Sequence, residues 1–348
     1  MALRVLVVDD SLTVRKRIVE TLARDSELEV VGECGDGKSA IELCQTLRPD
    51  VITLDMMLPI MTGLAATEWI MAHRPTPILI VSASTNRGEL FRTYEALAAG
   101  AVDVLDKPLG DEADDAWEAK LVRAVKLVSR IKVITHVRGK LAQPDRAPAR
   151  TLRAPAPACR VVAIGASTGG PSALSALLSD LGGDFPVPIL LVMHISTTFG
   201  AAFADWLDGL SPLRVTFAQD GMPLPQFGSG RVVMAPSDRH LFVRGDRLFL
   251  SDAPERHSCK PSVDVLFESV ATELGASATA CLLTGMGKDG AAGLLAIQKA
   301  GGYTIAQDEA SSVVYGMPRE AALLGAAREI LPLRGIAGAL RLRAGKAP

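Results

Sequence analysis

The chain has 348 residues, 48% of them hydrophobic, and a formal net charge of -2. This length predicts two domains, and the hydrophobic content is enough for two cores, which excludes wholesale disorder. Lysine and arginine form no long stripe, so the charge pattern does not indicate a nucleic-acid partner. The N-terminus reaches acidic residues too early for a signal peptide, and no apolar run is long enough to cross a bilayer. We therefore expect no membrane insertion.

The five cysteines are scattered and include no Cys-x-x-Cys pair; they are Cys34, Cys44, Cys159, Cys259 and Cys281. Disulfide frameworks and zinc sites usually show paired spacing, so we interpret these residues as free thiols. Free thiols are typical of a reducing cytoplasm, where we expect the protein to reside.

The first part of the chain alternates short apolar runs with amphipathic stretches. The apolar runs at residues 5–8, 51–54, 78–81 and 102–105 predict buried strands. Between them, Val14, Ile18 and Leu22 recur at helical spacing. This alternation predicts βαβ units and a parallel sheet with helices on both faces.

A basic amphipathic helix is predicted over residues 117–137, followed by a Pro/Ala-rich linker over residues 138–158. A second α/β series begins near Arg160. We therefore predict a first domain at residues 1–125, a linker region at 126–158 and a second domain at 159–348.

Polar side chains follow successive strands of the first domain. Asp9 and Asp10 end the first strand, Asp55 ends the third, Ser82 ends the fourth and Lys107 ends the fifth. In a parallel sheet these strand ends meet in one crevice. Three carboxylates there need a cation, and oxygen ligands favour Mg²⁺, while a hydroxyl and an ammonium can hold phosphoryl oxygens. Any one of these residues alone is more simply a solvated loop residue.

This constellation resembles the receiver domains of response regulators over residues 3–125. The resemblance implies a doubly wound, five-stranded, flavodoxin-like fold with Asp55 as phospho-acceptor. It also implies that Asp9, Asp10 and Asp55 bind Mg²⁺, with Ser82 and Lys107 as the switch residues and a cis peptide before Pro108. The chain departs from the family at Thr62, where Asp is frequent, and at Val104, where an aromatic residue is usual.

The second part predicts strands at residues 161–164, 189–193, 280–284 and 303–306. Shorter strands are predicted at 231–235 and within 241–250, the latter as a hairpin that turns at residues 244–246. The first of these strands runs directly into Ser167, on a turn flanked by glycines and followed by Pro171 at a helix start. A nucleophile elbow, a phosphate-binding loop and a structural turn all fit this motif, although the G-x-G-x-x-G spacing fails.

The residues at two further strand ends favour the interpretation of Ser167 as a nucleophile. His194 follows the strand at 189–193, and Asp289 follows the strand at 280–284. Ser, His and Asp at the carboxyl ends of separate strands of one sheet can converge as a catalytic triad. Their chain order is not that of the α/β-hydrolases, so a different, Rossmann-like fold would reach the same chemistry.

The motifs IGASTGG at 164–170, LTGMGKDGA at 283–291 and VVYGMP at 313–318 resemble the chemotaxis protein-glutamate methylesterase family, CheB. The resemblance implies a cytoplasmic serine hydrolase, needing no cofactor for catalysis, that demethylates glutamate methyl esters on chemoreceptors. It implies glutamine deamidation in some members, and phosphorylation by a chemotaxis-type histidine kinase. Ser167, His194 and Asp289 match the triad, and Thr168 and Met286 the accessory and oxyanion residues.

We expect the receiver to cover the esterase and inhibit it until Asp55 is phosphorylated, and we expect the protein to act as a monomer. The chain has Ile195-Ser196 where the family often has Met-Pro, at the expected substrate entrance. The alternative is a non-enzymatic response regulator whose second domain binds a ligand or partner.

Overall fold

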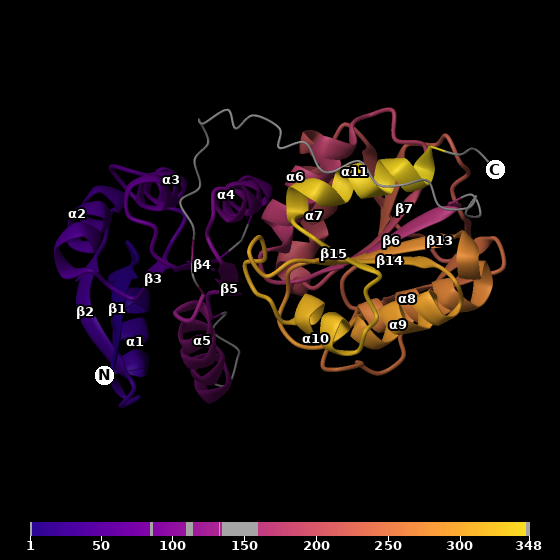
Figure 1. The fold of residues 1–348 in the computed structure, drawn as a ribbon. Helices are drawn as coiled ribbons and strands as arrows, with labels where there is room; N and C mark the ends of the chain where they lie inside the picture. Colours follow the sequence, from indigo (N-terminus) through magenta and orange to yellow (C-terminus); the bar gives the residue numbers. More distant parts are fainter. Residues whose placement is uncertain (1, 84–85, 109–113, 132, 134–158, 346–348) are drawn as a thin grey trace.

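The computed structural model describes residues 2–83, 86–108, 114–131, 133 and 159–345. Within them, each half of the chain forms one parallel sheet with helices on both faces, and the second half adds a small antiparallel sheet (Figure 1). The predicted fold class, two doubly wound α/β units, is confirmed. The linker predicted at 138–158 lies outside the described residues, so the predicted domain boundaries stay predictions.

The sheet of the first half has the strand order β2-β1-β3-β4-β5, which is the flavodoxin-like order. Alternate side chains of β1 enter two different cores, because Leu6 and Val8 face one cluster of buried residues and Val5 and Val7 the other. The strands are β1 (Leu3–Val8), β2 (Leu28–Cys34), β3 (Val51–Leu54), β4 (Ile78–Ser82) and β5 (Asp103–Asp106).

Helices α2, α3 and α4 cover one face of this sheet, and α1 and α5 cover the other. Four of these helices begin at a side chain that accepts a backbone N–H of the first turn; these N-caps are Ser11, Asp36, Thr62 and Asn86. Such caps each stabilise a helix by about 1 kcal/mol. The helices are α1 (Leu12–Ala23), α2 (Gly37–Leu47), α3 (Gly63–His73), α4 (Arg87–Ala98) and α5 (Asp114–Val128).

Some predicted elements differ from the structure. The strand list omitted β2, a half-exposed edge strand without a continuous apolar run. The helix predicted to reach residue 137 ends at Val128, where Arg130 and Ile131 donate hydrogen bonds three residues back and tighten the chain into a turn. Among the described residues the cis peptide precedes Pro261, so the cis peptide expected before Pro108 is wrong.

The sheet of the second half has the order β15-β14-β13-β6-β7-β10-β8, and its paired strands all run parallel. The chain first builds from β6 towards β7 and then returns to the other side with β13. The order therefore reverses at β6, which places a crevice at its carboxyl end. The strands are β6 (Val161–Ala166), β7 (Ile189–Met193), β8 (Arg214–Phe217), β10 (Arg231–Met234), β13 (Ala278–Leu282), β14 (Tyr303–Gln307) and β15 (Glu329–Leu331).

Two helical layers enclose this sheet (Figure 1). Helices α6, α7 and α11 lie on one face, and α8, α9 and α10 on the other. No described helix is both long enough and apolar enough to span a bilayer. The helices are α6 (Gly170–Leu181), α7 (Thr197–Leu210), α8 (Val263–Leu274), α9 (Ala291–Lys299), α10 (Met317–Leu323) and α11 (Leu333–Ala344).

The predicted hairpin is confirmed. Strands β11 (His240–Arg244) and β12 (Arg247–Ser251) pair antiparallel across Gly245 and Asp246, and β9 (Met222–Pro223) joins β12. Gly245 has a φ of 56°, the left-handed conformation that a two-residue hairpin turn favours.

Candidate active site

Ser167 follows β6 directly, at the point where the strand order reverses. Its backbone N–H donates to the carbonyl of Thr284, and its own carbonyl accepts from Gly170 at 2.7 Å, which closes a tight turn into α6. Gly169 has a φ of 78°, and a Cβ there would lie 2.5 Å from a carbon of Val313. Only glycine fits this position. The strand, turn and helix start predicted around Ser167 are all present.

Thr284 ties the turn to two other loops. Its buried hydroxyl donates to the carbonyl of Thr168 at 3.0 Å and accepts the N–H of Val314 at 2.9 Å. Its own N–H donates to the side-chain oxygen of Gln307, which is also buried. Three separate segments of the chain are therefore held together behind Ser167.

Gly285 lies against Ser167, since a Cβ on Gly285 would lie 2.7 Å from the Ser167 Cβ. This contact brings the following residue, Met286, next to the turn. The backbone N–H groups of Thr168, Gly169 and Met286 have no acceptor among the described residues. Unpaired N–H groups beside a hydroxyl can bind a developing negative charge.

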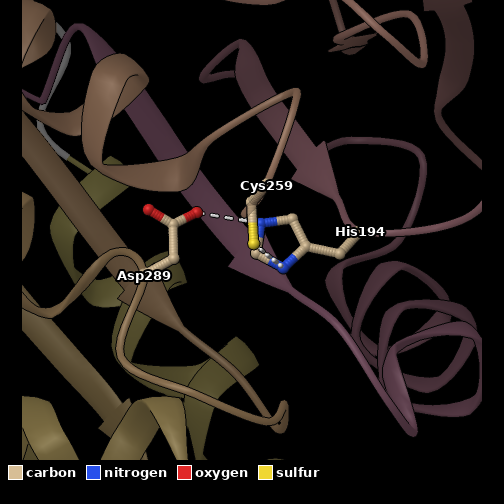
Figure 2. A group of neighbouring side chains, drawn as sticks. All are labelled: His194, Cys259 and Asp289. Carbon is tan, nitrogen blue, oxygen red and sulfur yellow. Dashed lines mark hydrogen bonds and ion pairs between the residues drawn. The ribbon is translucent and has the colours of Figure 1, made fainter. Parts of the chain in front are cut away.

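His194 and Asp289 form a hydrogen-bonded pair, with 2.9 Å between Nε2 and Oδ2 (Figure 2). Asp289 is 2% exposed and also accepts hydrogen bonds from the Ser262 hydroxyl at 2.7 Å and the Val263 N–H at 2.7 Å. These donors lie at the start of α8, where a helix N-terminus stabilises a negative charge. The carboxylate is thus fixed in position and points at the imidazole.

The pKa values of this pair diverge. Burial works to raise the pKa of Asp289, but the hydrogen bonds from His194 and Ser262 hold it below its usual value. Burial works to lower the pKa of His194, yet Asp289 and the neighbouring Cys259 raise it to about 9. A carboxylate that stays charged beside the imidazole orients the ring and stabilises the imidazolium that forms when the base takes up a proton.

Ser167 and His194 line the same cavity, of about 270 Å³, and neither is fully buried. Among the described residues, no hydrogen bond joins the two side chains. The second ring nitrogen of His194, Nδ1, instead lies 3.7 Å from the sulfur of Cys259. The structure therefore brings the three predicted triad residues to one crevice but leaves the serine and histidine unpaired.

The acidic residues of the first half also converge. One oxygen each of Asp9, Asp10 and Asp55 lies within 4.8 Å of the others. Lys107 Nζ contacts Asp9 at 2.8 Å and Asp55 at 2.9 Å, and the buried Ser82 hydroxyl has no hydrogen-bond partner among the described residues. Burial raises the pKa of Asp9, although Lys107 opposes that shift. All five predicted residues lie at this edge of the sheet.

The first half covers the crevice that contains Ser167. Thr168 Oγ1 donates to Asp103 Oδ2 of β5 at 3.1 Å, and Ser196 Oγ donates to Asp106 Oδ2 at 3.1 Å. Val104, where the receiver family usually has an aromatic residue, lines the same cavity as Ser167. Two positions at which the sequence departs from its families, Val104 and Ser196, therefore lie at the contact between the two halves.

An apolar contact supports these polar ones. Tyr94 of α4 is fully buried, and its hydroxyl donates to the carbonyl of Phe199 in α7. Its ring lies 5.4 Å from the ring of Phe203 and 5.3 Å from that of Trp206, measured between centroids. One continuous cluster of buried side chains consequently runs from the α2–α4 face of the first sheet to α6 and α7 of the second.

Sequence reasoning missed several residues of this site. Ser262, Thr284 and Gln307 support Asp289 and the Ser167 turn, Cys259 contacts His194, and Asp103 covers Thr168. Thr284 is the last residue of the strand predicted at 280–284 and lies in the LTGMGKDGA motif, so its place at a strand end is the signal that could have identified it. Nothing in the local pattern singles out the others.

The chain matches two families of known proteins. Residues 162–340 match the family described as CheB methylesterase, and residues 5–114 match the response regulator receiver domain. A protein-glutamate methylesterase/protein-glutamine glutaminase of Nitrosospira multiformis is 44% identical over 97% of this chain and 96% of its own. One from Myxococcus xanthus is 44% identical over the same shares.

Among solved structures, the CheB methylesterase catalytic domain of Thermotoga maritima is 35% identical, with a TM-score of 0.49. It covers 53% of this chain and 97% of its own. A non-enzymatic output domain is not favoured, because the second half matches an esterase family and the full-length relatives carry the name of an enzyme. The chain belongs to the CheB methylesterase family, with a response regulator receiver domain preceding the methylesterase domain.

Proposed function

We propose that this protein removes methyl groups from glutamate side chains of chemoreceptors, under the control of phosphorylation. The observation that carries the proposal is the convergence of Ser167 and His194, which directly follow β6 and β7, with Asp289 from the loop between β13 and α9. The distance from His194 Nε2 to Asp289 Oδ2 is 2.9 Å. The full-length relatives named as methylesterases support the same activity.

In the proposed reaction, the Ser167 hydroxyl oxygen bonds to the carbonyl carbon of the ester. Nε2 of His194 is engaged by Asp289, so Nδ1 is the nitrogen that accepts the serine proton. Because Ser167 and His194 are not hydrogen-bonded in this covered conformation, the side chains must approach when the crevice opens. The base then returns the proton to the departing methoxide, which leaves as methanol.

Water completes the cycle by attacking the acyl-serine, with His194 again as base, which releases the glutamate carboxylate and restores the serine. The backbone N–H groups of Thr168, Gly169 and Met286, which have no acceptor in the part of the chain that the structure describes, are the proposed donors to the oxyanion. One such donor contributes about 3–4 kcal/mol in comparable enzymes. The same steps on a glutamine side chain would release ammonia, so glutamine deamidation is a second reaction of this site.

The control site is the acidic cluster. We propose Asp55 as phospho-acceptor, with a chemotaxis-type histidine kinase as donor. Asp9, Asp10 and Asp55 would hold Mg²⁺, since three carboxylates within 4.8 Å of one another are a suitable set of oxygen ligands. The ion would supply charge neutralisation for phosphoryl transfer. The Ser82 hydroxyl, which has no hydrogen-bond partner among the described residues, and the Lys107 ammonium, which contacts Asp55, would bind the phosphoryl oxygens.

The receiver domain would inhibit the esterase by occlusion. The Asp103 carboxylate accepts the hydrogen bond of the Thr168 hydroxyl, and Val104 lines the cavity beside Ser167. Both belong to β5, which ends just before Lys107, so a phosphoryl group on Asp55 acts on the strand that covers the crevice. We further propose a cytoplasmic monomer, a placement in keeping with the five free cysteines.

The test is methanol release from methylated receptor membranes. Ser167→Ala should lower the rate by about 10³-fold or more, because the residues of a triad act as a unit. Ser179→Ala, on the exposed part of α6, is the matched control and should leave the rate unchanged. A folded Ser167→Ala variant with near-wild-type turnover would remove Ser167 from the role of nucleophile.

A further inference from the structure

An imidazole, a thiol and a carboxylate, three side-chain groups that can bind a metal, lie together around His194, the proposed base. One ligand atom each of His194, Cys259 and Asp289 lies within 4.8 Å of the other two (Figure 2). Asp289 contacts Nε2 of the imidazole, and the Cys259 sulfur lies 3.7 Å from Nδ1. The spacing of cysteines in the sequence indicated no zinc site, but the fold joins this cysteine to a histidine 65 residues away.

The distance between sulfur and nitrogen suits a shared metal ion. Zn²⁺ binds thiolate sulfur at about 2.3 Å and imidazole nitrogen at about 2.0–2.1 Å, so a tetrahedral ion separates the two atoms by about 3.6 Å. The observed separation is 3.7 Å. The pair therefore needs little rearrangement to bind such an ion.

Asp289 plays a different part in this arrangement. Its oxygens already accept hydrogen bonds from Ser262, Val263 and Asp264 as well as from His194, so it has little capacity left for a metal. It is instead the carboxylate behind the imidazole. Histidines that ligate zinc commonly donate their other N–H to such a carboxylate, which orients the ring and raises its basicity.

The site is also accessible and pre-formed. Cys259 and His194 both line the cavity that contains Ser167, which gives an ion a route and leaves room for water ligands. Cys259 is held by two backbone hydrogen bonds with Arg256, of 3.1 and 2.9 Å. The other cysteines are either buried, as Cys44, Cys159 and Cys281 are, or lie in the receiver domain, as Cys34 does.

We propose that His194 and Cys259 form a binding site for a borderline-soft divalent cation, Zn²⁺ above all, and that occupation of this site inhibits the esterase. Binding exchanges the thiol proton for the metal, with the proton released to solvent. The ion takes the Nδ1 lone pair, so His194 can no longer accept the Ser167 proton. The inhibition rests on the proposed role of His194, whereas binding does not. Mg²⁺ prefers oxygen ligands and would not compete.

The test uses the full-length protein in excess Mg²⁺, which saturates the carboxylates of the receiver. Co²⁺ is the spectroscopic probe, because a thiolate bound to Co²⁺ gives a sulfur-to-metal charge-transfer band that oxygen ligands do not give. Tris(carboxyethyl)phosphine replaces dithiothreitol as reductant, since dithiothreitol itself binds zinc. Wild type and Cys34→Ser should show the band, and Cys259→Ser and Cys259→Ala should lack it. Ser167→Ala, inactive as an esterase, should keep it.

In parallel, Zn²⁺ inhibition is measured against each variant's own metal-free rate. The Zn²⁺ concentration for half-inhibition should rise by about tenfold or more in Cys259→Ser, and stay unchanged in Cys34→Ser. A charge-transfer band that persists in both Cys259 variants, or is absent from wild type, overturns the site. Equal Zn²⁺ sensitivity of wild type and Cys259→Ser overturns the inhibition. An inactive wild type that still gives the Cys259-dependent band would contradict the proposed function and leave the metal site supported.

Discussion

Asp103 of the receiver sheet accepts a 3.1 Å hydrogen bond from the hydroxyl of Thr168, the residue that follows the proposed nucleophile. Burial raises the pKa of Asp103, so its carboxylate is held at this interface against a cost of desolvation. The contact joins β5, the strand that ends just before Lys107, to the first residue after Ser167. Together with the 3.1 Å hydrogen bond from Ser196 to Asp106, it connects β5 to the crevice that contains Ser167.

Removing this connection should partly release the esterase. Asp103→Ala is expected to raise the rate of the unphosphorylated protein by about fivefold, and to reduce stimulation by acetyl phosphate correspondingly. Methanol release with and without acetyl phosphate measures both quantities. Asp115→Asn, on the exposed side of α5, is the control for loss of a receiver charge. Equal basal rates in Asp103→Ala and wild type would mean that the contact does not restrain the enzyme.

The pH dependence of the esterase should reflect His194. Only the neutral imidazole can accept the serine proton, and the pKa of His194 is raised to about 9. The rate should therefore rise with pH towards a plateau above pH 9, and at pH 7 should be about 100-fold below that plateau. Protonated His194 stabilises the fold below pH 6.5, and this stabilisation is lost as the pH rises through about 9.

The measurement is kcat/KM across this range, without transition metals and with chemistry rate-limiting. Cys259→Ser should move the ascending limb to lower pH, because the Cys259 contact helps to raise the pKa of His194. A limb centred near the usual histidine value in wild type would contradict the expected environment of the base.

Ser262 should affect both stability and catalysis. Its hydroxyl caps α8 and donates to Asp289, so Ser262→Ala should lower the free energy of unfolding by about 1–3 kcal/mol. Loss of the donor also raises the pKa of Asp289, which weakens its support of protonated His194 and moves the ascending limb to lower pH. Ser269→Ala, which removes hydroxyl hydrogen bonds elsewhere on α8, should reduce stability without moving the limb. Identical behaviour of the two variants would reduce Ser262 to a helix cap.

Asp55→Asn should separate control from chemistry. The amide is similar in size but cannot form an acyl phosphate, so the basal esterase rate should persist while acetyl phosphate and Mg²⁺ have no effect. Phosphate incorporation and methanol release are measured together. Asp50→Asn, just before the opposite end of β3, is the control and should still be phosphorylated. Undiminished incorporation in Asp55→Asn would place the acceptor elsewhere.

The sequence could predict the strand-end residues, because the carboxyl ends of parallel strands share one edge and each of these residues follows an apolar run. Ser167, His194 and the five receiver residues were found in this way. This rule could not identify Ser262 and Cys259, because neither follows an apolar run. Ser262 lies at a helix start and Cys259 in a loop, and the fold brings them to Asp289 and His194, which are distant in the sequence. The edge strand β2 was missed because most of its residues are only half-buried or exposed, and it has no continuous apolar run.

The single hydroxyl of Thr284 has a consequence for the exchange of loops between relatives. It bonds both the segment after β6 and the segment before α10, so neither loop has an independent conformation. In a chimaera that received only the IGASTGG segment from a distant relative, the transplanted turn would have to hydrogen-bond with this chain's own Thr284, which is also bound to Val314. We expect function to survive only when the three segments around residues 168, 284 and 314 are transplanted together, as one inherited unit.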